Sequence, residues 1–112
     1  MSVAGDEAPA AAPSARALVA LDRLVHEPAR LAILTVLAEA EEVEFRFLES
    51  VTGLTKGNIS SHVAKLEAAD YVTVTKRFQG RKPVTSYRIT ATGRAALDAY
   101  RAALSELVRP PT

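Results

Sequence analysis

The sequence contains no cysteine, which excludes disulfide bonds, thiolate metal sites and thiol redox switching. Its two histidines, His26 and His62, lie far apart and have no neighbours at metal-ligand spacing. No apolar run approaches the roughly 18 residues that a membrane span needs. The first 14 residues lack the basic start and apolar core of a secretory signal. We therefore expect a cytoplasmic protein with no membrane partner, no bound metal and no other cofactor.

Motifs for catalysis are missing as well. The chain has no paired catalytic carboxylates, no nucleophile beside a base and no glycine-rich phosphate loop. We therefore do not expect an enzyme. What is present is 48% hydrophobic and 24% charged residues in a chain of 112, which is typical of one globular domain with a modest core.

The net charge of +1 hides an uneven distribution along the chain. Residues 1–54 hold four basic and nine acidic side chains, whereas residues 55–88 hold seven basic and two acidic ones. Positive charge gathered in one segment is expected of a surface that binds a polyanion, and chance clustering is the alternative. The acidic residues Glu41, Glu42 and Glu44 lack the spacing of a calcium loop, so we interpret them as a solvated turn.

Apolar residues recur at helical spacing in the first third of the chain. Residues 1–14, rich in Ala and Pro, lack this periodicity and are expected to form a disordered tail. The helical pattern begins at Ala15. A first helix is predicted by Leu18, Leu21, Leu24 and Val25. Pro28 suits the first turn of a second helix, whose apolar residues on several sides predict a central, buried position.

A helix-turn-helix motif is predicted in the middle of the chain. A brief strand over residues 41–45 precedes a short helix over residues 46–52. The apolar residues of that helix are expected to face inward: Phe47, Leu48 and Val51. Gly53 fits a left-handed C-cap, and the Thr55 hydroxyl can cap the next helix, residues 56–69.

Alternating residues then predict a β-hairpin with a basic tip around "QGRKP". Thr90 is expected to cap a last helix that carries Leu97, Tyr100, Leu104 and Leu107. The predicted fold class is therefore α+β, mainly α, with one domain over residues 15–109 and a C-terminal tail over residues 110–112.

The helix over residues 56–69 has an unusual exposed face. At about 100° per residue, Ile59, Val63 and Leu66 form its buried stripe. Its polar face carries short side chains and cations: Lys56, Asn58, Ser60, Ser61, His62 and Lys65. A merely solvated helix usually carries better helix formers than Ser and Asn. Short donors and acceptors suit base edges in a DNA major groove, and the exposed amides of a helix N-terminus suit a phosphate.

The stretch "LTKGNISSHVAKLEAADYVTVTKRFQGRKPVTSYRITATGRAAL" resembles the winged-helix transcriptional regulators of the MarR-like and ArsR-like kind, particularly the small single-domain members. The resemblance covers roughly residues 18–107. It rests on the helix-turn-helix, the passage "LEAADYV" into the first wing strand, the "FQGRKP" wing and "YRITATGRAAL" at the last helix. It implies a winged helix-turn-helix with a two- to three-stranded antiparallel wing and flanking dimerisation helices.

The resemblance also implies which residues touch DNA. Recognition helix 56–69 would enter the major groove, and wing 76–88 would lie on the backbone or in the minor groove. The expected contacts of the recognition helix are Thr55, Lys56, Asn58, Ser60, Ser61, His62 and Lys65. Those of the wing are Lys76, Arg77, Gln79, Arg81 and Lys82. Wing cations at a hairpin tip are commonly just solvated, but beside a recognition helix they favour phosphate neutralisation.

The family usually dimerises through its outer helices. A homodimer seam is therefore expected at Leu18, Leu21, Val25, Leu97, Tyr100, Leu104 and Leu107, and plain core is the alternative for the residues of the last helix. Such regulators are most often repressors, and a small-molecule effector between the dimer helices and the DNA-binding core is a further implication. We interpret His26 as a structural or capping residue.

The leading hypothesis is a homodimeric repressor that binds double-stranded DNA at a specific, roughly palindromic sequence. The alternative is a winged-helix adaptor that binds another protein, because a fold does not determine a function. Such adaptors often lose the polar stripe of the recognition helix. This chain keeps the stripe and a basic wing.

Overall fold

The computed structural model describes residues 11–110. Eight elements follow one another in this range: α1 (Ala11–Val19), α2 (Pro28–Ala38), β1 (Val43–Glu44), α3 (Phe45–Thr52), α4 (Lys56–Ala68), β2 (Val72–Gln79), β3 (Lys82–Ile89) and α5 (Ala91–Leu107). The three strands form an antiparallel sheet in the order β1-β3-β2. The predicted order of elements and the predicted winged helix-turn-helix fold are confirmed.

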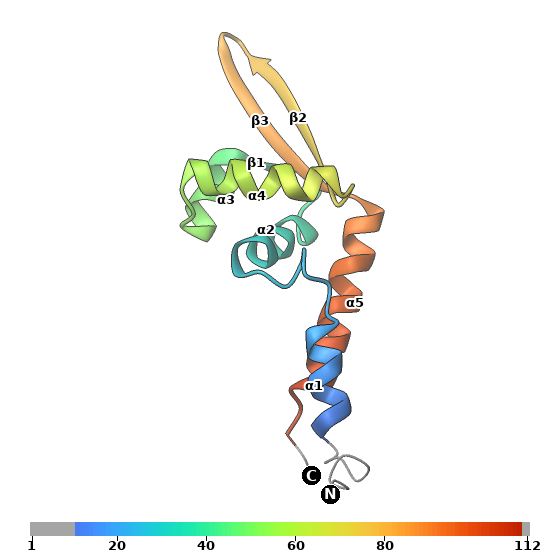
Figure 1. Ribbon diagram of the computed structural model, residues 1–112. Coiled ribbons are helices and arrows are strands. Elements are labelled where there is room, and N and C mark those ends of the chain that lie inside the picture. Colours follow the sequence, from blue (N-terminus) through green and yellow to red (C-terminus); the bar gives the residue numbers. More distant parts are fainter. Residues whose placement is uncertain (1–10, 111–112) are drawn as a thin grey trace, which may run out of the picture.

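The elements form a small body with two projections (Figure 1). Helices α2, α3 and α4 pack together in the body, and the β2–β3 hairpin, the wing, projects from one side of it. On the opposite side α1 lies beside the far half of α5, and the two helices form a stalk. The wing and the stalk therefore point away from each other, with α4 at the base of the wing.

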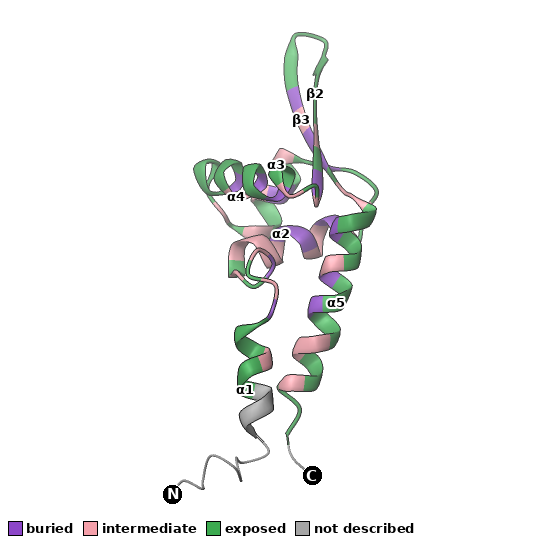
Figure 2. Ribbon diagram, turned by 45° about the vertical axis from the view of Figure 1, so that its right-hand side comes forward, coloured by how far each residue is buried: buried purple, intermediate pink, exposed green. Residues whose placement is uncertain are grey.

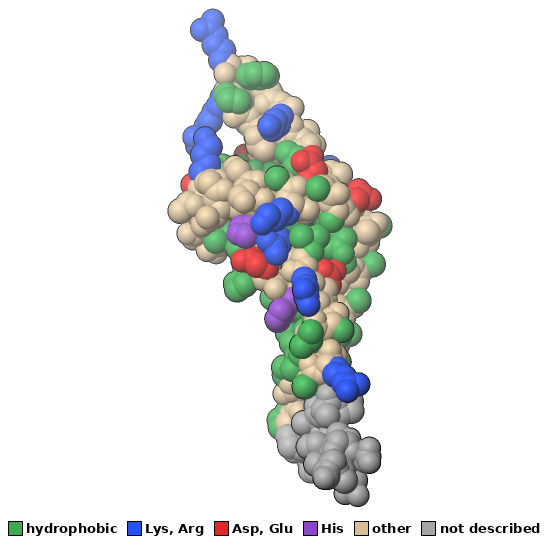
Figure 3. Space-filling model, viewed as in Figure 1, with side chains coloured by type: hydrophobic (Ala, Val, Ile, Leu, Met, Phe, Trp, Pro, Cys, Tyr) green, Lys and Arg blue, Asp and Glu red, His purple; other side chains and the backbone are tan. Residues whose placement is uncertain are grey.

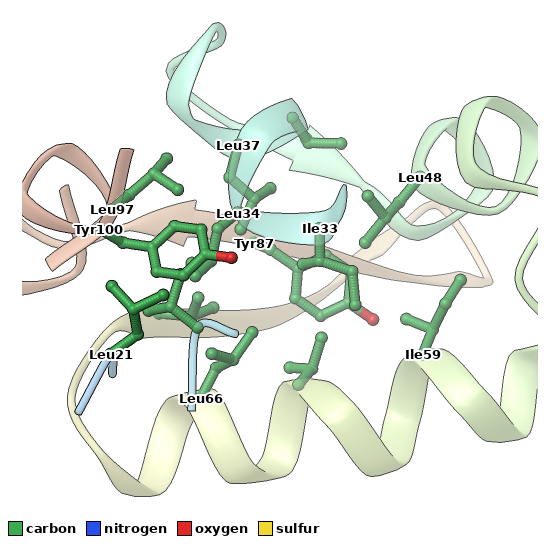
Figure 4. Packing of buried hydrophobic residues seen from close by; sticks show 14 residues of the cluster. Leu21, Ile33, Leu34, Leu37, Leu48, Ile59, Leu66, Tyr87, Leu97 and Tyr100 are labelled. Carbon is green, nitrogen blue, oxygen red and sulfur yellow. The ribbon is translucent and has the colours of Figure 1, made fainter. Parts of the chain in front are cut away.

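Helix α2 is the centre of the core, as its apolar residues on several sides predicted. Ile33, Leu34 and Leu37 are fully or almost fully buried, and residues from every neighbouring element surround them (Figure 4). The burial extends to the base of the wing but not along its outer half, which is largely exposed (Figure 2). The core thus fixes α4 and the base of the wing against α2.

The turn between α3 and α4 follows the predicted capping chemistry. Gly53 ends α3 in the left-handed conformation, with φ of 71°. Thr55 precedes α4 with an extended backbone, and its Oγ1 accepts the N–H of Asn58 at 3.1 Å. These two caps set the direction in which α4 leaves the turn.

The first helix differs from its prediction at both ends. It begins at Ala11, inside the segment predicted to be a tail, while residues 1–10 and 111–112 of the two predicted tails lie outside the described residues. It ends at Val19, because Asp22 stabilises a non-helical turn instead. The Asp22 carboxylate accepts the backbone N–H groups of Leu24 and Val25 at 2.9 and 3.3 Å.

The prediction that Phe47, Leu48 and Val51 of α3 face inward is wrong for two of these three residues. Leu48 is fully buried, but Phe47 is 55% exposed and Val51 is 49% exposed. A helix of eight residues places only a narrow strip against the core, and Leu48 fills that strip.

Candidate nucleic-acid interface

Helix α4 turns an exposed polar face away from the core. Ile59, Val63 and Leu66 are buried against the body. Five of the residues predicted to contact DNA are exposed on the other sides of the helix: Lys56, Asn58, Ser60, Ser61 and Lys65. The exposed face also includes Gly57 and Ala64, so its centre is lined by small side chains and the longer cations stand toward its ends.

Within residues 11–110, no packing contact requires a glycine at position 57. It lies in the first turn of α4 with an ordinary helical backbone, and a Cβ atom added there would meet no atom within 4 Å. Glycine in a helix costs about 0.5–1 kcal/mol relative to alanine. A glycine that neither a turn nor a packing contact requires is consistent with close approach by an external surface.

His62 differs from its neighbours because the chain itself holds it. Its side chain is 18% exposed, and its Nδ1 accepts a hydrogen bond from Arg30 Nη1 at 3.2 Å. Since guanidinium groups only donate, the proton of neutral His62 lies on Nε2. Arg30 also donates to the carbonyl oxygens of Leu24 and Arg23. His62, predicted to contact DNA, is thus held by the chain itself and links α4 to Arg30 of α2, and its contact with DNA stays a prediction.

Glu27 completes this junction beneath α4. Its carboxylate caps α2 by accepting the N–H of Arg30 at 2.7 Å, and it lies 3.9 Å from His62 Nδ1. Burial raises the pKa of Glu27, but the hydrogen bond from the Arg30 N–H and the nearby positive charge of Arg30 lower it, and the pKa is lowered overall. The carboxylate therefore stays ionised and holds the start of α2.

A groove of about 750 Å³ separates α4 from the wing. Lys56, Ser60 and Ala64 line it from α4, and Lys76 and Lys82 line it from the wing. Further lining residues are Glu44, Phe45, Arg46, Val63, Glu67, Val74, Gln79, Pro83, Val84, Thr85 and Tyr87. The groove thus joins the two predicted contact surfaces into one, with four cations against two carboxylates around it.

An ion-pair network fixes the base of the wing. Arg77 donates to Glu42 at 3.0 Å, to Glu44 at 3.4 Å and to Ser86 Oγ at 3.2 Å. Arg88 pairs with Glu42 at 3.0 Å, and the fully buried Ser86 hydroxyl donates to the same carboxylate at 2.5 Å. The hydrogen bond from Ser86, together with those from Arg88 and Arg77, lowers the pKa of Glu42.

Two predictions change because of this network. The glutamates that were interpreted as a solvated turn neutralise the cations at the base of the wing. Arg77, predicted to contact DNA, has its guanidinium engaged by Glu42, Glu44 and Ser86, so we assign it to holding the wing in place.

The remaining cations of this region are free of acidic partners. Within residues 11–110, no ion pair is formed by Lys56, Lys65, Lys76, Arg81 or Lys82. Figure 3 shows Lys and Arg side chains from the tip of the wing down toward the left end of α4. These cations and the polar face of α4 form one continuous surface, which we call the α4–wing surface.

The predicted dimer seam divides into buried and accessible residues. Leu21, Val25, Leu97 and Tyr100 are buried in the chain's own core, so for these four the prediction is wrong and plain core is the correct interpretation. They join α5 and the connector to α2. Leu18 is 39% exposed, and Leu104 and Leu107 are half-buried.

His26 has the structural role predicted for it. Its Nδ1 lies 2.6 Å from the Tyr100 hydroxyl, and the two rings pack at a centroid distance of 5.6 Å. The contact joins the connector to α5 beside a small hollow of about 300 Å³.

Three further residues on or beside the α4–wing surface were not predicted from the sequence: Arg46, Gly57 and Phe78. Arg46 lines the groove but lies among glutamates in the sequence, so its segment looked acidic. Gly57 was not singled out because the interpretation of this helix rested on its polar neighbours. Phe78 was passed over because its alternation with polar neighbours predicted an ordinary hairpin, although it is 73% exposed at the tip. The feature that distinguishes Phe78 is its position on the part of the hairpin that projects from the body, and this position is known only from the fold.

Residues 11–110 hold neither a membrane-spanning helix nor a cluster of metal-ligating side chains. None of the helices between residues 11 and 110 is long and apolar enough to span a membrane. In the same range no three His, Cys, Asp or Glu side chains are grouped so that they could hold a metal ion.

Comparison with known proteins places this geometry in context. A family model described as a winged helix DNA-binding domain matches residues 29–108. An uncharacterized protein of Methanocaldococcus jannaschii is 32% identical over 78 residues, which are 70% of this chain and 85% of that protein.

Solved structures share the fold. A transcriptional regulator homologue from Pyrococcus horikoshii OT3 superposes with a TM-score of 0.77 at 26% identity, covering 83% of this chain and 94% of that one. A MarR-family transcriptional regulator from Silicibacter pomeroyi has a TM-score of 0.58 at 18% identity, covering 88% of this chain and 68% of that one. The chain belongs to the family of winged helix DNA-binding domains.

Proposed function

We propose that this chain is a transcriptional regulator that binds double-stranded DNA at a specific sequence. The observation that carries the proposal is the α4–wing surface. Its polar side chains are short, its five free cations have no acidic partner between residues 11 and 110, and Gly57 leaves room for close approach. Helix α4 would lie in the major groove with Asn58, Ser60 and Ser61 toward base edges. The wing cations would neutralise phosphates.

The active species in this proposal is a homodimer that acts as a repressor, because a bound dimer blocks the DNA that it covers. The stalk supports it: Leu18, Val19 and Val108 are exposed apolar residues on or next to α1 and α5. Two copies joined there would present two α4 helices to successive major grooves, about 34–36 Å apart. A small-molecule effector would lodge in the hollow lined by His26, Glu27, Pro28, Leu31 and Tyr100, between the stalk and the body.

A labelled duplex, selected by the protein from a random-sequence pool, tests the proposal by fluorescence anisotropy against a scrambled duplex across a salt series. We expect tighter binding to the selected duplex, with the preference persisting as salt rises. If the pool yields no enriched sequence and binding to every duplex is absent at low salt, a protein-binding adaptor replaces the regulator.

Asn58→Ala separates base reading from charge. Its side chain can pair with a base edge, so the variant should lose about 1–3 kcal/mol of discrimination while keeping most of its affinity for the scrambled duplex. Lys65→Ala is the matched control on the same helix, and it should weaken binding to both duplexes equally. An equal loss on both duplexes for Asn58→Ala would contradict its base-reading role.

A further inference from the structure

The tip of the wing carries an apolar pair that the fold does not use. Phe78 is 73% exposed and pairs directly across the hairpin with Pro83, which is also exposed. Figure 3 shows hydrophobic side chains just below the tip of the wing, and the exposed hydrophobic residues there are these two. Burial of a phenylalanine side chain stabilises a fold, so a phenylalanine left in water forgoes a stabilising contact.

The pair lies on the same face of the hairpin as apolar residues at the base of the wing, with Lys76 and Thr85 between them. Side chains alternate between the faces of a strand, so Phe78 and Pro83 share a face with Val74 and Tyr87. Tyr87 is buried and Val74 is half-buried at the base of the wing, where the body covers this face. At the tip no other part of residues 11–110 covers it, and Pro83 lines the groove toward α4.

The positive charge around Phe78 and Pro83 indicates what kind of surface the pair would bind. Lys76, Arg81 and Lys82 flank it, and the sequence has no acidic residue from Tyr71 to Leu97. A second copy of the tip would be repelled by its own charge. A surface with anionic rims that offers apolar ring faces between them fits. In the minor groove of DNA the phosphates lie along both edges and the base edges on the floor are polar, but the apolar faces of the bases become accessible where a base step opens.

The wing is long enough to reach such a groove. Five residues of β2, from Thr75 to Gln79, extend past Val74, which at about 3.3 Å per residue is about 16 Å. The minor groove of B-DNA is about 7.5 Å deep. The tip therefore has length to spare when α4 lies in the neighbouring major groove.

We propose that Phe78, supported by Pro83, is a wedge that enters the minor groove beside the site of α4, partly unstacks one base step and bends the duplex. Apolar side chains inserted between base steps bend DNA in this way. The inference rests on the proposed function and adds to it a reading of DNA deformability: flexible pyrimidine–purine steps should be preferred at the position of the wedge.

The test uses the selected duplex with 2-aminopurine placed at each adenine in turn, because the fluorescence of this base rises when it unstacks. Wild-type protein should raise the fluorescence at one step outside the α4 site, and donor and acceptor dyes at the duplex ends should report a bend. Phe78→Ala should lose both signals and about tenfold in affinity, yet keep the salt slope, because it removes no charge. Phe47→Ala, an exposed phenylalanine on α3, is the matched control and should keep both signals.

Each other outcome overturns the wedge. If wild-type protein binds the duplex with no unstacking at any position, or if Phe78→Ala unstacks it as wild type does, the wedge is wrong while the proposed regulator stands. If wild-type protein binds no duplex, the proposed function fails and the wedge fails with it. A Phe78→Ala variant that melts below wild type is replaced by Phe78→Thr, which keeps a strand-forming residue and still removes the ring.

Discussion

At the scale of the single residue, Gly57 and Asp70 both occupy conformations that another residue would adopt at lower free energy. Gly57 is helical in open space, and Asp70 is left-handed, with φ of 64°, at the end of α4. The N–H groups of Asp70 and Tyr71 donate to the carbonyls of Glu67 and Leu66, so Asp70 holds the position that glycine usually takes in such a C-terminal motif.

Gly57→Ala should stabilise the fold and weaken DNA binding. The added Cβ meets nothing in the chain, so the free energy of unfolding should rise by about 0.5–1 kcal/mol, measured by urea denaturation. If DNA approaches the backbone here, the same methyl group should lower affinity for the selected duplex.

Asp70→Gly is the matched control for this comparison. It should stabilise the fold by about 1 kcal/mol through relief of the left-handed strain, yet leave affinity unchanged if Asp70 lies off the DNA. Undiminished binding by Gly57→Ala would mean that nothing approaches this turn of α4.

How far single residues were predictable depends on how local their bonds are. The caps made by Thr55 and Thr90 bond groups three residues away, and the sequence predicted both. The bond between Arg30 and His62 joins residues 32 apart, and no periodicity encodes it. His62 therefore looked like a surface residue until the fold brought α2 beneath α4.

At the scale of the element, the wing depends on a few charged groups at its base. Glu42 is ionised there because Ser86, Arg88 and Arg77 donate to it and lower its pKa below the ordinary 4.5. The folded chain consequently binds fewer protons than the unfolded chain at mildly acidic pH. The stabilisation is complete above pH 4.5 and is lost as pH falls through the lowered pKa of the folded state.

Glu42→Gln should remove this part of the pH dependence. In urea denaturation at a series of pH values below 5, the stability of the wild type should fall more steeply than that of the variant. Glu106→Gln, at the far end of α5 beside Arg109, is the control and should fall as the wild type does. Parallel curves for Glu42→Gln and wild type would show that the network does not hold the base of the wing.

The wing tip should contribute charge as well as the apolar pair. Arg81→Ala with Lys82→Ala removes two cations without acidic partners in residues 11–110, so the slope of log affinity against log salt should fall by about 1 per lost phosphate contact. Arg109→Ala removes a cation at the opposite end of the molecule and should leave the slope unchanged. A slope that stays the same in the wing variant would place the tip away from DNA.

Elements were predicted well where their pattern is long and poorly where it is short. The eight-residue strands of the wing alternate clearly, and both were predicted. Helix α3 has four apolar residues in eight positions, Phe45, Phe47, Leu48 and Val51, and its pattern gave no way to decide which of them the core would bury. Leu21, Leu24 and Val25 have helical spacing, yet the helix ends before them. The Asp22 carboxylate accepts backbone N–H groups in this segment and so stabilises a non-helical turn.

At the scale of the whole molecule, the apolar face of α5 both packs in the core and continues along the stalk, and the sequence could not show where one part ends and the other begins. Periodicity along α5 places Leu97, Tyr100, Leu104 and Leu107 on one face. The half of this face near the body is core, and the half beyond the body lies beside α1. The half of the α5 face that is accessible to a partner is the half that α2 does not cover. The position of α2 on α5 follows from the assembled fold and cannot be derived from periodicity.

The accessible half of the stalk should therefore control association without controlling folding. Leu18→Glu with Val19→Glu places two charges on exposed positions of α1, so the melting temperature should stay near that of wild type. Sedimentation equilibrium should show a wild-type dimer and a variant monomer, because two copies would bring four carboxylates into one apolar seam.

Leu97→Ala should have the opposite effects, because it should lower stability without preventing dimerisation. Its side chain is fully buried, so the substitution should cost about 2–5 kcal/mol of stability while the folded fraction still dimerises.

The monomeric stalk variant should keep weak binding to a single half-site and lose the gain in affinity that a palindrome gives the dimer, since one recognition helix cannot reach two major grooves. A stalk variant that remains dimeric would mean that another face joins the copies, and the spacing of the half-sites would then have to be derived from that face.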